Sequence, residues 1–162
     1  MNYHLTMMMA LFAIPMLASA DDATSNLIAK DMVQTSNIAH EMAPLKSATE
    51  TRQYIQSMPE NLSPLNALSA TERSAFVDSL RFNEKGLTQF DYTLLAKLPS
   101  DEIYRILALF GMQSSTGLIP SKLNDDSHDY SLLRLADFLL DYRCSDRATC
   151  SSAVHSACTS NC

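Results

Sequence analysis

Tryptophan is absent from this sequence of 162 residues, and glycine occurs only three times. Tight turns and phosphate-binding loops use glycine because it adopts positive φ angles without a steric penalty. A chain with three glycines therefore has few such turns. The missing tryptophan removes the side chain that most often stacks on a sugar ring. Both absences favour an all-α domain.

Positive charge is also scarce. The chain carries 12 lysines and arginines against 18 acidic residues, which gives a formal net charge of -6, and no run of basic residues occurs. Nucleic-acid binding requires a concentrated basic face. We therefore expect no nucleic-acid partner, and no attraction to an anionic membrane surface.

The common catalytic signatures are missing. No serine lies in a G-x-S-x-G or S-x-x-K motif, and no two cysteines have the C-x-x-C spacing of redox-active pairs. Glu102 stands beside the most apolar segment and is the acid to consider for hydrolysis of a polymer. Its position at a predicted helix N-terminus also explains it as a partner of the helix dipole. We predict no catalytic residue and no cofactor.

One dense group of possible metal ligands occurs, in the segment Asp125–Asp129. A calcium loop that started at Asp125 would need glycine at its sixth position and glutamate at its twelfth. Tyr130 and Ala136 occupy these two positions. We interpret the acids as residues that suit the positive end of a helix dipole, and we predict no metal site.

The first twenty residues contain no Asp, Glu, Lys or Arg. The apolar stretch Met7–Leu17 is too short to cross about 30 Å of hydrocarbon, and Ala18–Ala20 provides a small-x-small cleavage pattern. We predict that residues 1–20 are a secretory signal peptide, with no stable membrane anchor. A bacterial periplasm is favoured over eukaryotic secretion, because the single glycosylation sequon, Asn61–Ser63, is followed by Pro64.

The remainder is long enough for one domain, and its hydrophobic periodicity predicts a small helical bundle over residues 21–143. Ser69 and Glu72 form a capping box that starts a helix. A short strand over Thr88–Tyr92 is the weaker alternative to a helix over 88–98. We expect the helices near 101–110 and 129–142 to form the hydrophobic centre. The expected helices span residues 24–43, 47–57, 70–85, 88–98, 101–110 and 129–142.

All four cysteines lie in the last nineteen residues, at Cys144, Cys150, Cys158 and Cys162. In an exported chain they indicate two disulfides, with three possible pairings. A zinc site is the alternative, but zinc sites favour C-x2–4-C pairs, and only Cys158-x3-Cys162 comes close. We expect a disulfide-linked tail over 144–162, packed on the helical domain, with a short helix over 151–158. Each bond should add at most roughly 2–3 kcal/mol on the chain-entropy model.

These observations favour an exported, non-catalytic protein that binds another envelope or extracellular protein. Arg143, Arg147 and His155 form the one local patch without net acidity, and we predict them as a contact surface. Two alternatives remain open. Wide apolar helices can line a cavity, which fits a carrier of a small hydrophobic ligand. An envelope-polymer hydrolase is the third hypothesis.

Overall fold

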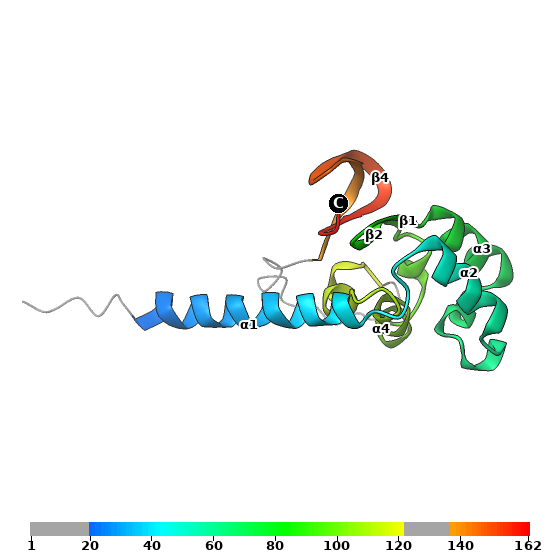
Figure 1. The fold of residues 1–162 in the computed structure, drawn as a ribbon, viewed down its shortest axis with the longest axis horizontal. Helices are drawn as coiled ribbons and strands as arrows, with labels where there is room; N and C mark the ends of the chain where they lie inside the picture. Colours follow the sequence, from blue (N-terminus) through cyan, green and yellow to red (C-terminus); the bar gives the residue numbers. More distant parts are fainter. Residues whose placement is uncertain (1–19, 122–136) are drawn as a thin grey trace, which may run out of the picture.

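The computed structural model describes residues 20–121 and 137–162 (Figure 1). The predicted signal peptide, apart from Ala20, and the acidic segment 125–129 lie outside the described residues. Within the described ranges, none of the helices combines the length and the apolarity that crossing a membrane requires.

Helices dominate the first part of the chain. Ser47 caps α2, and Ser69 and Glu72 form both hydrogen bonds of a capping box at the start of α3, as predicted. Pro44 follows the end of α1, also as predicted. The helices are α1 (Ala20–Met42), α2 (Ala48–Ser57), η1 (Glu60–Leu62), η2 (Pro64–Ala67), α3 (Ala70–Ser79), η3 (Leu95–Lys97), α4 (Ser100–Ala108) and η4 (Gln113–Leu118).

The all-α prediction is wrong, because the chain also forms a four-stranded antiparallel sheet. The spatial order of the strands is β1-β2-β4-β3, so the C-terminal strand β4 pairs with β2 in the interior of the sheet. The cysteine-containing tail is thus a central structural element. The strands are β1 (Arg81–Asn83), β2 (Gly86–Asp91), β3 (Phe138–Asp146) and β4 (Thr149–Thr159).

The helix predicted over 88–98 is instead strand β2 followed by the short helix η3. Leu87 and Phe90 are buried on β2, whereas Leu95 is buried from η3. Their spacing resembled a helical repeat because a strand and a 3-10 turn follow each other closely. The weaker alternative, a strand over Thr88–Tyr92, was close to the observed element.

A helix was predicted over 129–142. Its residues from Phe138 onward belong instead to strand β3. The short helix predicted over 151–158 is also wrong, because these residues form part of strand β4. The two segments pair with each other as antiparallel strands, with Phe138 opposite Thr159 and Arg143 opposite Ser151. Pairing between the two strands overrode the local helical pattern.

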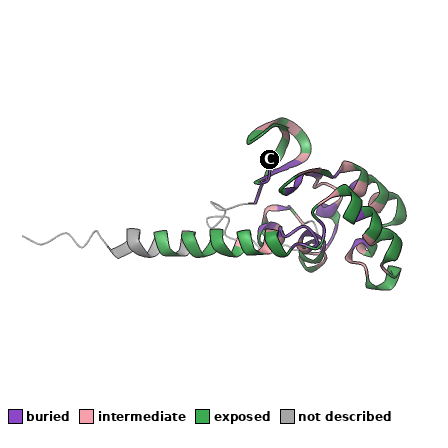
Figure 2. Cartoon of the chain, viewed as in Figure 1, coloured by how far each residue is buried: buried purple, intermediate pink, exposed green. Residues whose placement is uncertain are grey.

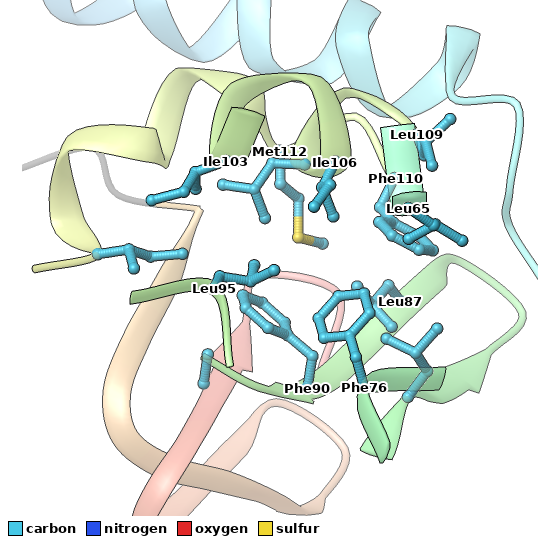
Figure 3. Packing of buried hydrophobic residues seen from close by; sticks show 14 of the residues in the cluster. Leu65, Phe76, Leu87, Phe90, Leu95, Ile103, Ile106, Leu109, Phe110 and Met112 are labelled. Carbon is cyan, nitrogen blue, oxygen red and sulfur yellow. The ribbon is translucent and has the colours of Figure 1, made fainter. Parts of the chain in front are cut away.

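Helix α4 and the sheet enclose the hydrophobic core (Figure 3). Ile103 and Ile106 of α4 are fully buried and face Phe76 and Phe90 across the core. The ring of Phe90 also packs edge-on against Phe138, with centroids 5.2 Å apart. Phe138 therefore anchors the start of β3 in the core, at a distance where aromatic pairs attract each other.

Helix α1 extends beyond the rest of the molecule, and most of its surface is exposed (Figures 1 and 2). Its last turns approach Gly111 so closely that a Cβ there would lie 2.5 Å from the carbonyl oxygen of Ala39. Gly111 also has a φ of +75°, which favours glycine. This contact fixes the C-terminal end of α1 against the segment that follows α4.

Candidate functional site

Residues 138–162 curl back on themselves, and we refer to them as the C-terminal arch (Figure 1). Phe138 pairs with Thr159, three residues before Cys162. In a straight strand Cys144 would lie about 20 Å from Phe138. The disulfide Cys144–Cys162 nevertheless brings its Cα atoms to 5.5 Å. The hairpin must therefore bend until its outer half returns to its base.

The second disulfide joins Cys150 to Cys158 inside β4, across a separation of eight residues. Both bonds lie within the tail, as predicted, and they select one of the three possible pairings. Cys144 and Cys150 are direct cross-strand partners, yet they are not bonded to each other. Each instead closes a longer loop, which holds the curvature of the arch.

A local irregularity in both strands produces the bend. Leu140 pairs with Ala157 and Tyr142 with Ser152, so one residue of β3 faces four residues of β4. Asp141 has a φ of +61°, a conformation that aspartate tolerates better than most residues. Such bulges bend a strand and redirect its side chains.

The Asp141 carboxylate holds this bend together. Its Oδ1 accepts a hydrogen bond from the backbone N–H of His155 and another from the Tyr92 hydroxyl, both at 2.9 Å. The backbone N–H of Tyr92 donates to the carbonyl of His155. One carboxylate thereby links β3, β4 and the chain that follows β2.

These hydrogen bonds shift both side-chain pKa values. The bond from the His155 N–H, followed by that from Tyr92, lowers the pKa of the Asp141 carboxyl. Partial burial, together with the bond to Asp141, raises the pKa of the Tyr92 hydroxyl. The charged carboxylate and the neutral phenol are therefore the stable forms near neutral pH.

The tip of the arch is a two-residue turn, Arg147–Ala148, between Asp146 and Thr149. Ala148 has a φ of +55°, which strains a residue with a Cβ. Its N–H donates to the backbone oxygen of Cys162 at 2.7 Å. The tip is thus attached to the end of the chain by a hydrogen bond as well as by the nearby disulfide.

Asp137 connects the base of the arch to α1 and η4. This residue is 3% exposed, and its carboxylate accepts hydrogen bonds from Ser36 of α1, from Ser114 at 2.5 Å and from Ser115 at 2.9 Å. The His40 Nε2 atom lies 3.7 Å from Asp137 Oδ1 and has no hydrogen-bond partner among the described residues. In this geometry the hydroxyls bind the carboxylate directly, so they do not form a serine–histidine–aspartate relay.

A cavity of about 270 Å³ lies within the curl of the arch. This volume is just below the range of about 300–1,000 Å³ that is usual for small-molecule sites. Residues from the base and from the tip of the arch line the cavity together. They are Asp137, Phe138, Leu139, Ala148, Cys150, Cys158, Thr159, Ser160 and Cys162.

Among the described residues, one group of side chains has the proximity that metal binding requires. The sulfurs of Cys150, Cys158 and Cys162 lie within 4.8 Å of one another. All three belong to disulfides, so they have no thiolate to offer a metal ion. The group is a cluster of two neighbouring disulfides.

The three residues predicted as a contact surface all lie exposed on the arch. Arg143 is on β3, Arg147 is at the tip and His155 is at the bend. Since successive strand residues alternate in direction, Arg143 points away from the face that carries Cys144. Exposed apolar side chains accompany them, notably Val154, which is 74% exposed in the bulge of β4.

Sequence reasoning missed Asp137, Asp141 and Tyr92, which hold the base and the bend. Asp137 was placed inside a predicted helix, where a buried acid has no evident role. A bulge leaves no periodic signal that could have identified Asp141. The other candidate acid, Glu102, lies half-buried in the first turn of α4, as predicted.

Comparison of the chain with protein-family models, with curated proteins and with solved structures finds no match. Function is therefore inferred from the geometry of the arch.

Proposed function

We propose that this chain is an exported, non-catalytic protein that binds another envelope or extracellular protein through the outer surface of its C-terminal arch. One observation carries the proposal. The arch is fixed in shape by two disulfides, and it exposes apolar and basic side chains instead of burying them. A rigid element loses little conformational entropy on binding.

The side chains on the arch suit a protein partner. Val154 and Tyr142 are exposed apolar groups, and Arg143 and Arg147 are exposed cations. Tyrosine and arginine are enriched where interfaces have their strongest contacts. The arginines favour an acidic, partly apolar patch on the partner, because charges across an interface are complementary. They are a local exception on a chain whose net charge is negative.

The test is affinity capture from an envelope extract, with matched variants of the full chain. The arch variant carries Arg143→Glu and Arg147→Glu. The control carries Arg52→Glu and Lys85→Glu, which lie exposed outside the arch and change the net charge equally. We expect the control to retain a partner that the arch variant binds about 30-fold more weakly, equivalent to the ~2 kcal/mol of a strong interface contact.

The proposal fails if the arch variant and the control retain the same proteins in equal amounts. It also fails if a disulfide-reduced and alkylated sample retains every protein that the wild-type chain retains. In the second comparison, the shape of the arch is lost while the sequence remains.

A further inference from the structure

The arrangement of the four sulfurs points to a chemical activity within the arch. We propose that thiols convert the arch from its present disulfide pairing to a second one, Cys144–Cys150 with Cys158–Cys162, by internal thiol–disulfide exchange. The reacting class is a small or protein thiol, which is regenerated at the end. This inference is independent of the proposed binding partner.

Access determines the first step. Cys144 is half-buried on β3, whereas its partner Cys162 is 4% exposed. Thiolate attack on a disulfide requires access to the sulfur that is attacked. Cys150 is half-buried as well, and attack there leads by the mirror sequence to the same final pairing. In the route through Cys144, an external thiolate attacks Cys144 Sγ, forms a mixed disulfide there and releases Cys162 as a thiolate.

Proximity determines the second step. The Cys162 sulfur lies within 4.8 Å of both sulfurs of the neighbouring disulfide. Its thiolate attacks Cys158 Sγ, which forms the bond Cys158–Cys162 and releases Cys150 as a thiolate. The exchange passes between two disulfides of one chain and needs no further reactant.

Strand register determines the third step. Cys144 and Cys150 are direct cross-strand partners, and partner Cα atoms in an antiparallel pair lie about 4.5–5.5 Å apart. This separation falls within the range that disulfides require. The Cys150 thiolate attacks the mixed disulfide at Cys144 Sγ, forms Cys144–Cys150 and expels the external thiolate. Two disulfides are present before and after, so no net oxidation or reduction occurs.

The exchange alters what the bonds hold. In the present pairing, Cys144–Cys162 attaches the outer half of β3 to the end of the chain. In the second pairing, one bond joins β3 to β4 and the other closes a small ring at the chain end. No covalent bond then attaches the tip to the base, so the curl can open. The hydrogen bond from the Ala148 N–H to Cys162 is the contact to be lost.

The test is a peptide mass map of the oxidised chain after incubation with reduced glutathione, followed by acid quenching and alkylation. Trypsin alone cannot distinguish the pairings, because Cys150, Cys158 and Cys162 all lie in one peptide, 148–162. A second cleavage before Val154 separates Cys150 from the other two. The present pairing then joins three peptides, whereas the second joins 144–147 to 148–153 and leaves 154–162 with an internal bond.

We expect the three-peptide species to be replaced over time by the two separate species, in native buffer. The amide of Ala148 should lose its protection from hydrogen exchange at the same rate. In the control Cys150→Ser with Cys158→Ser, Cys162 has no disulfide to attack. There we expect a glutathione adduct to accumulate on Cys144, with Cys162 available for alkylation.

The proposal is overturned if the three peptides stay joined in the wild-type chain, or if only glutathione adducts and alkylated cysteines form. It is also overturned if the second pairing appears only in urea, since exchange would then require global unfolding. Because no partner protein is present, none of these results depends on the proposed binding function.

Discussion

We refer to residues 20–121 as the helical part, although they also contain strands β1 and β2. The helical part and the C-terminal arch are stabilised in different ways. The first has fully buried apolar side chains such as Phe76 and Ile103. About half of the arch residues are exposed. The arch is held by disulfides, by the hydrogen bonds to the Asp141 carboxylate and by turns with positive φ angles. Damage to the helical part should therefore spread to the arch, whereas damage to the arch should stay local.

The largest effect is expected from Phe76→Ala. This ring is fully buried and packs against Phe90 and Phe110. Phenylalanine-to-alanine changes at such sites lower the free energy of unfolding by about 3–5 kcal/mol. Urea denaturation checks the magnitude, and Tyr104→Ala, half-exposed on α4, is the control. A loss below about 1 kcal/mol would contradict a shared core.

Replacing Cys144 and Cys162 together by serine should loosen the arch alone. The bond closes a separation of 18 residues, which corresponds to about 3 kcal/mol on the chain-entropy model. Replacing Cys150 and Cys158, separated by eight residues, should remove about 2.5 kcal/mol. Hydrogen exchange provides the measurement, with protection expected to fall in 138–162 and to persist in α3 and α4. Equal loss in both regions would remove the distinction between them.

The same division explains what the sequence could predict. Ser47, Ser69 and Pro44 act within a few residues, so the end of α1 and the starts of α2 and α3 followed from local rules. The helix predicted over 70–85 instead ends at Ser79, and strand β1 follows it. The presence of two disulfides followed from the cysteine positions. The strands β3 and β4 were not predicted, because their apolar residues do not alternate regularly with polar ones along the sequence. The bend at Asp141 depends on Tyr92, 49 residues away, which no local pattern reports.

Asp137→Ala tests the connection between the two regions. The change leaves the hydroxyls of Ser36, Ser114 and Ser115 without their acceptor. Loss of a buried acceptor lowers the free energy of unfolding by about 1–3 kcal/mol. Thermal unfolding gives the magnitude, with Asp78→Ala, at an exposed position, as the control. If both variants unfold at the wild-type temperature, the carboxylate does not hold the arch to α1.

A smaller change of opposite sign is expected at the tip. Ala148 has a φ of +55°, a conformation that destabilises residues with a Cβ by roughly 1–2 kcal/mol. Ala148→Gly should therefore raise the stability of the arch. The expected net gain is about 0.5–1 kcal/mol, because the greater flexibility of glycine in the unfolded chain offsets part of the relieved strain. The control Ala153→Gly lies in the same hairpin without a positive φ and should be destabilising. Equal effects at both sites would contradict the strain at the tip.

The smallest expected effect is a loss of stability on acidification, which should come from a different carboxylate in each region. Bound donors lower the pKa of Asp141 in the arch. In the helical part, Lys97 and then Ser69 lower the pKa of Glu72 from 4.5 to about 2. A lowered folded-state pKa contributes stability that is complete above the unfolded pKa and is lost as the pH falls through the folded value. Both contributions should therefore be complete at neutral pH and should decline on acidification, for Glu72 between 4.5 and about 2.

Variants separate the two contributions. Asp141→Asn should remove the acid dependence of amide protection at His155, whose N–H loses its charged acceptor, and should leave α3 unchanged. Glu72→Gln should do the reverse, because its carboxylate pairs with Lys97 at 2.7 Å outside the arch. Asp141 is exposed and Glu72 is partly exposed to solvent, so each effect should weaken as salt is added. If Asp141→Asn instead altered the acid response of α3, the bend would be coupled to the core, and the arch could not be treated as a separately stabilised element.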